Sequence, residues 1–200
     1  NAARFQPDIV VLAAGFGKDQ TMLNVNWSGN YGHSHYDNAS IILFANGAEL
    51  LSDIGYTHSK YRGWTLHTAS HNTVVIDQKV QDQGTLVKPV TGRLMYYDDQ
   101  NPQVKVVDLD ASPAYSTSTE YRRRLIFVHA AEGMDYVIDR FDVAGGETHD
   151  WFLHGMCEEE GKLETSISMD RDVKTLVPEW GGTAVPMNQY DSDMTGKKIH

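Results

Sequence analysis

The chain contains one cysteine, Cys157, so it cannot form an internal disulfide. It has no apolar run near the ~20 residues that a membrane-spanning helix needs, and no signal peptide is visible in it. Basic residues are scarce: 17 lysines and arginines stand against 27 acidic residues, for a formal net charge of −10. Non-specific nucleic-acid binding requires a basic surface. The sequence therefore predicts neither a nucleic-acid partner nor a membrane partner.

No window shows a sustained 3.6-residue apolar period, which argues against long helices. Instead, short strand-like runs recur between turn residues, a pattern typical of an antiparallel β-sandwich or barrel. We predict an all-β antiparallel sandwich that forms one domain over residues 1–200. The predicted strands are residues 9–14, 21–26, 39–45, 48–52, 73–76, 92–97, 104–109, 122–129, 136–143 and 148–155, with further candidates at 162–169 and 172–177.

A histidine-rich segment, Tyr31-Gly32-His33-Ser34-His35-Tyr36-Asp37-Asn38, precedes the predicted strand at 39–45. In an extended backbone side chains alternate with period 2, so His33 and His35 would lie on the same side. Two such imidazoles can share a metal ion, or one can face a substrate while the other anchors the site. Asp53 and His71 follow downstream, beside small or turn-forming residues. Two imidazoles and a carboxylate are a plausible zinc set with a fourth position open.

Two carboxylates compete for a place in this set. Asn46-Gly47 predicts a two-residue hairpin, because a type I′ turn needs positive φ at both positions. A strict hairpin pairs Ser40 with Asp53 and puts His35 on the opposite face. Asp53 can then join His35 only if a bulge or bend intervenes, or if His35 precedes the regular strand. Asp37 meets no such obstacle, so both carboxylates stay open at this point.

Three motifs, in order along the chain, resemble one known family. They are the His-x-His-x-Asp-Asn segment, Asp53-Ile54-Gly55-Tyr56 after the hairpin, and Ser70-His71-Asn72-Thr73-Val74-Val75-Ile76-Asp77. Residues 8–85 thereby resemble the heparinase II/III-like polysaccharide lyases, and a weaker similarity runs from Tyr121 to Trp151. The resemblance implies a lyase β-sandwich domain that follows an N-terminal α/α-toroid domain. Because the chain begins at Asn1 and not at methionine, we expect it to be a piece of such a longer polypeptide.

The resemblance also implies roles for individual residues. It makes His33 the catalytic candidate, facing an acidic polysaccharide or oligosaccharide that is cut at uronic acids by β-elimination. It makes His35, Asp53 and His71 the ligands of a structural zinc ion, which favours Asp53 over Asp37. The family's catalytic tyrosine belongs to the helical domain, so no tyrosine of this chain is assigned. A periplasmic or secreted bacterial location is implied as well.

Lys60 and Arg62, between the hairpin and His71, are predicted to contact the acidic sugar. The remaining histidines are interpreted as structural or surface residues. One alternative is a cupin-like metal enzyme, which expects a glutamate three or four residues after the His pair, where this chain has Asn38, Ala39 and Ser40. The other alternative is a non-catalytic sandwich that supports other domains or binds sugar, with histidines that only tie loops together.

Overall fold

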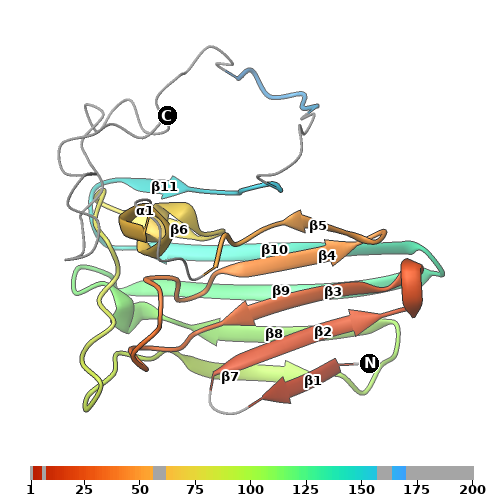
Figure 1. Cartoon of the computed structure of the whole chain (residues 1–200), viewed down its shortest axis with the longest axis horizontal. Coiled ribbons are helices and arrows are strands. Elements are labelled where there is room, and N and C mark those ends of the chain that lie inside the picture. The colour runs from red at the N-terminus through yellow and green to blue at the C-terminus, as the bar shows by residue number, and fades with distance from the viewer. Residues whose placement is uncertain (1, 6–7, 56–61, 157–163, 170–200) are drawn as a thin grey trace.

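Two antiparallel sheets form the body of the molecule (Figure 1). The computed structural model describes the backbone of residues 2–5, 8–55, 62–156 and 164–169. One sheet has the strand order β1-β2-β3-β4-β5 and the other β10-β9-β8-β7, with antiparallel pairing throughout. The strands are β1 (Ala2–Phe5), β2 (Ile9–Ala14), β3 (Thr21–Asn26), β4 (Ile41–Ala45), β5 (Ala48–Leu51), β7 (Arg93–Asp98), β8 (Val104–Asp110), β9 (Glu120–Ala131) and β10 (Met134–Ala144). The predicted all-β antiparallel sandwich is confirmed.

A short helix and a short strand lie together at one end of the sheets (Figure 1). A two-stranded sheet joins β6 (Val74–Ile76) to β11 (His149–Trp151), and α1 (Arg62–Leu66) lies in the chain between β5 and β6. Single 3-10 turns occupy Gly17–Asp19, Thr68–Ser70 and Ser112–Ala114. Within the described residues, no helix is long and apolar enough to cross a membrane.

The predicted strands from residue 9 to residue 143 are confirmed, with ends that differ by a few residues. β1 was not expected, and the run at 148–155 contains only the three residues of β11. The candidate strand at 162–169 is wrong where the structure describes it: residues 164–169 form no strand and are all exposed, so they bury no apolar face of the kind that stabilises a sheet. The candidate at 172–177 lies outside the described residues.

The core lies between the two large sheets because their strands alternate between buried and more exposed positions. In β3 Thr21, Leu23 and Val25 are buried, and the residues between them are only partly so. β9 follows the same alternation from Tyr121 to Phe127. The buried apolar cluster draws on both sheets and on β6: Val10, Leu12, Leu23, Val25, Trp27, Ile41, Val74, Ile76, Val107, Leu109, Tyr121, Leu125 and Phe127.

One inward position of β9 carries a buried charge. Arg123 is fully buried, and its guanidinium donates two hydrogen bonds to the Asp139 carboxylate on β10, at 3.0 and 2.6 Å. Its Nη1 donates to the backbone carbonyls of Ala39 and Asn72, both at 2.6 Å. The guanidinium also lies over the Phe141 ring, 5.0 Å from its centre. Arg123 therefore ties the β9–β10 pair to the segments that precede β4 and β6.

We predict that Arg123→Lys destabilises the fold by about 2 kcal/mol, because an ammonium group cannot reproduce the planar fork that serves two carboxylate oxygens and two carbonyls. Urea unfolding of the variant measures this cost. Arg93→Lys is the matched control, since the Arg93 side chain is 71% exposed and its pair with Asp110 lies at the surface. Equal midpoints for the two variants would contradict this role of Arg123.

Candidate metal centre

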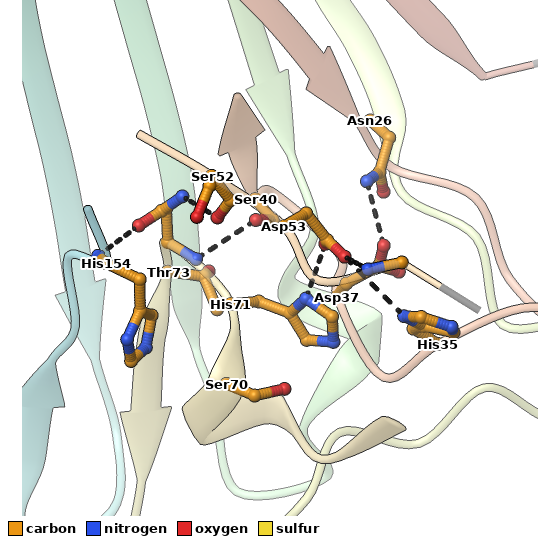
Figure 2. A network of polar contacts seen from close by, with 12 residues as sticks. Asn26, His35, Asp37, Ser40, Ser52, Asp53, Ser70, His71, Thr73 and His154 are labelled. Carbon is orange, nitrogen blue, oxygen red and sulfur yellow. Dashed lines mark hydrogen bonds and ion pairs between the residues drawn. The ribbon is translucent and has the colours of Figure 1, made fainter. Parts of the chain in front are cut away.

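Three side chains from separate segments converge near the end of β5 (Figure 2). His35 comes from the loop between β3 and β4, Asp53 follows β5, and His71 follows the 3-10 turn before β6. Each offers one ligand atom, and these atoms lie within 4.8 Å of one another. Asp53 lies between the imidazoles, with one carboxylate oxygen 2.7 Å from His71 Nδ1 and the other 4.0 Å from His35 Nδ1. Both histidines are buried, at 7% and 1% exposure.

A β-bulge explains how Asp53 reaches this position. Asn46 and Gly47 have φ of 55° and 75°, as the predicted hairpin turn requires. The register then shifts: Phe44 pairs with Glu49 but Leu43 pairs with Leu51, which leaves Leu50 as an extra residue. A shift of one residue reverses the side of the sheet that later residues face. β4 begins only at Ile41, so His35 also precedes the regular strand. The strict pairing of Ser40 with Asp53 is therefore not formed.

The His33–His35 segment is a loop and not a strand, so the period-2 expectation fails there. His33 is exposed while His35 is buried. Two buried glutamines hold the loop. Gln81 accepts from the Asn38 backbone N–H at 2.6 Å and donates to the Asn38 carbonyl at 3.0 Å. Gln83 accepts from the Ser34 hydroxyl at 3.2 Å. These bonds fix the backbone on both sides of His35.

Asp37, the competing carboxylate, is engaged elsewhere. It accepts a hydrogen bond from the Asn26 side-chain amide at 3.1 Å (Figure 2). Burial raises the pKa of the Asp37 carboxyl to about 6, with the His71 charge and the Asn26 hydrogen bond opposing this rise and the Asp53 charge adding to it. Asp37 thus contributes charge to the surroundings of the cluster, while Asp53 is the carboxylate placed against both imidazoles.

In the cluster, His71 and Asp53 form an ion pair in which each favours the charged form of the other. Burial alone would raise the pKa of Asp53, but the hydrogen bond and charge of His71 hold it below its ordinary value. Burial alone would likewise lower the pKa of His71, but the Asp53 hydrogen bond and the carboxylate charges of Asp37 and Asp53 hold it above its ordinary value. Such a site favours a positive charge next to the carboxylate, and a metal ion can take the place of the proton.

The donor set agrees with a zinc ion on two counts. Two imidazole nitrogens and one carboxylate oxygen form a three-ligand set of the kind that zinc takes, leaving one position open. In addition, His71 Nε2 is a buried ring nitrogen that makes no hydrogen bond of good geometry among the described residues. Buried polar atoms normally have a partner. The residues therefore fit the metal that the sequence suggests.

Two other histidines near the cluster make structural hydrogen bonds, in line with their interpretation from the sequence. His67 Nδ1 accepts from the Ala69 N–H at 3.1 Å, and burial lowers the pKa of His67 to about 4. His154 Nε2 lies 2.8 Å from the Ala69 carbonyl, and burial lowers the pKa of His154 too. Burial therefore disfavours the charged form of both rings beside His71.

A family model now accounts for most of the sequence. The model described as "Heparinase II/III-like, C-terminal" matches residues 19–180. The chain belongs to the heparinase II/III-like family. Membership in this family overturns the cupin-like alternative. No sequence among the curated proteins matches the chain.

Solved structures share the fold of this heparinase II/III-like chain. The heparinase III BT4657 gene product is 19% identical with a TM-score of 0.65, over 82% of this chain and 25% of that one. Heparan sulfate lyase HepC from Pedobacter heparinus is 21% identical with a TM-score of 0.56, over 74% of this chain and 23% of that one. The heparinase II/III-like chain thus spans about a quarter of the length of these structures.

Two predicted substrate-binding residues of the heparinase II/III-like chain are not tested by the structure, and three residues near the cluster were not predicted. Lys60 lies outside the described residues, and of Arg62 the structure describes only the backbone, which begins α1. Asn72, Gln81 and Arg123 were not identified from the sequence, although they hold the segments around the cluster. For Asn72 a signal existed: it directly follows His71 in a run of small polar residues.

Proposed function

We propose that this chain forms the β-sandwich part of a polysaccharide lyase that cuts uronic-acid-containing glycans by β-elimination. The single observation that carries the proposal is the position of His33, an exposed imidazole two residues from a histidine buried in the three-residue cluster. The names of the matched structures, a heparinase III and a heparan sulfate lyase, support an acidic glycan as the substrate class.

The chemistry asks for a base near a weakly acidic proton. The uronate C5–H lies next to a carboxylate, so His33 would accept the C5 proton on an imidazole nitrogen. The electron pair left behind forms the C4–C5 double bond as the C4–O4 bond breaks, and O4 leaves with a proton from an acid. Histidine suits the basic role because its pKa lies near neutrality. The exposure of His33 makes it accessible to a polymer.

We propose that His35, Asp53 and His71 hold a structural zinc ion. When bound, the ion would supply a fixed link between the three chain segments that carry these residues. His35 would then be unable to move, and His33 would be held by the same short stretch of backbone. In this proposal the buried histidines do not contact the sugar, which agrees with their exposures of 7% and 1%.

The remaining catalytic groups are proposed to come from an N-terminal helical domain of the same polypeptide. The chain spans about a quarter of the length of the matched structures, which leaves ample length for such a domain. We propose a periplasmic or secreted bacterial location for the whole protein. Lys60 and Arg62 are proposed to bind the substrate carboxylate or sulfate. If so, Lys60→Ala and Arg62→Ala raise KM with little change in kcat; an unchanged KM would remove them from the site.

The direct test is an elimination assay on the full-length protein that carries this chain. Heparin, heparan sulfate and alginate are offered in turn, and the ultraviolet absorbance of the unsaturated uronate product is followed. We expect product from at least one of these polymers. Absence of product from every uronate polymer would leave the non-catalytic alternative, a supporting or sugar-binding sandwich, as the function of the domain.

A further inference from the structure

One buried side chain touches every segment that carries a ligand of the candidate metal centre. Asn72 is completely buried and directly follows His71. Its side-chain amide donates to the carbonyl of Ser52, the residue before Asp53, at 3.0 Å. The same amide donates to the carbonyl of Ile41, where the His35 loop enters β4, at 2.8 Å. Three segments distant in sequence are thus joined through one amide group.

The remaining polar groups of Asn72 also form hydrogen bonds with neighbouring segments. Its side-chain oxygen accepts from the His154 backbone N–H at 2.6 Å, and its own backbone N–H donates to the Ser40 hydroxyl at 3.1 Å. Its carbonyl accepts from Arg123, which also binds the carbonyl of Ala39. Every polar group of Asn72 therefore has a partner, and most of these partners flank a ligand-bearing segment.

We propose that Asn72 is a positioning residue that sets the spacing of His35, Asp53 and His71 for metal binding. The inference deepens the proposed zinc site and rests on it. Only an amide side chain offers two N–H donors together with an acceptor on one short stem. Aspartate lacks the donors, and alanine lacks all three groups. Asn72 is not one of the three candidate ligands, so its proposed effect runs through the backbone that carries them.

Groups that orient metal ligands typically change metal affinity by about 10- to 100-fold when they are removed. The effect arises because ligand atoms must be held close to their bound geometry before the ion arrives. We therefore expect Asn72→Ala to weaken zinc binding of the full-length protein by about 10- to 100-fold. The measurement is a zinc titration against a competing chromophoric chelator, together with the visible absorption spectrum of the cobalt-substituted protein, which reports ligand geometry.

Asn38→Ala is a closely matched control. Asn38 is also completely buried and lies in the same loop as His35, yet neither polar atom of its side chain has a hydrogen-bond partner among the described residues. The same chemical change at Asn38 should leave zinc affinity within about threefold of the wild type and the cobalt spectrum unaltered, by the size of measured outer-shell effects. A comparison of the two variants thus separates positioning from simple loss of a buried amide.

Two results would overturn the inference. The first is zinc affinity of folded Asn72→Ala equal to that of the wild type, even if the variant unfolds at lower urea, because its role would then be structural alone. The second result comes from Ser40→Ala, which is measured if Asn72→Ala does not fold. Ser40→Ala removes only the acceptor for the Asn72 backbone N–H; it should weaken zinc binding by a smaller factor, and an unchanged affinity would count against the proposal. A wild type that binds no zinc would instead refute the proposed metal site itself.

Discussion

Replacing His33 with alanine is expected to lower the elimination rate of the full-length protein by about 10²- to 10⁴-fold, the usual contribution of a general base. The imidazole is exposed, so its loss is expected to cost the fold little. Melting temperature and zinc content should therefore stay at wild-type values while activity falls. Loss of activity without loss of stability is expected when the replaced residue acts on the substrate. Replacing a residue that only supports the fold would lower the melting temperature as well.

His149→Ala provides the control for this experiment. His149 is equally an exposed histidine, but it lies on β11, and its ring nitrogen is 2.8 Å from the Gly145 carbonyl. Its replacement should leave the rate unchanged to within about twofold, since surface substitutions away from a site have small effects. Initial rates from product absorbance measure both variants. If His33→Ala keeps more than half of the wild-type rate, His33 is not the base.

Replacing His71 with alanine is expected to abolish the part of the stability that depends on zinc. A ligand that binds only the folded state adds about 4 kcal/mol when its free concentration is 1,000 times its dissociation constant. Wild-type protein should therefore unfold at clearly higher urea with zinc than with a chelator. His71→Ala should unfold at the same urea concentration under both conditions, because it removes the ligand that makes the 2.7 Å contact with Asp53.

His129→Ala is the matched control for the metal-dependent effect. His129 also pairs with an aspartate, its Nδ1 lying 2.6 Å from Asp135, but it is on β9 and outside the three-residue cluster. The variant should keep the full difference between zinc and chelator. Identical unfolding of the wild type with and without chelator would show that no stabilising ion binds, and a surviving zinc response in His71→Ala would show that the ion binds elsewhere.

The positions of the strands could be predicted because alternation is a local property. In β3 and β9 every second side chain enters the core, and this is visible in the order of residues alone. The expectation that His33 and His35 lie on the same side was wrong because period 2 holds only in extended strands. This segment is a loop held by Gln81 and Gln83, nearly fifty residues downstream. Contacts at that separation leave no local pattern.

The choice between the two carboxylates shows the same limit. Hairpin geometry at Asn46-Gly47 correctly located the turn, yet the extra residue at Leu50 decides which side Asp53 faces. The apolar residues around Leu50 give no sequence signal that predicts a bulge. Arg123 is a comparable case, since it stands between two other arginines and resembles a surface charge. Its burial depends on Asp139 and on two backbone carbonyls from distant loops.

We propose that His35, Asp53 and His71 together hold one metal ion beside His33. The most direct test is the metal content of the full-length protein, purified without chelator and measured by elemental mass spectrometry, alongside the Asp53→Asn variant, which keeps the side-chain shape. We predict about one zinc ion per chain in the wild type, as a three-ligand site should bind, and a near-complete loss in the variant. Absence of metal from the wild type, or equal metal in both proteins, would contradict the account.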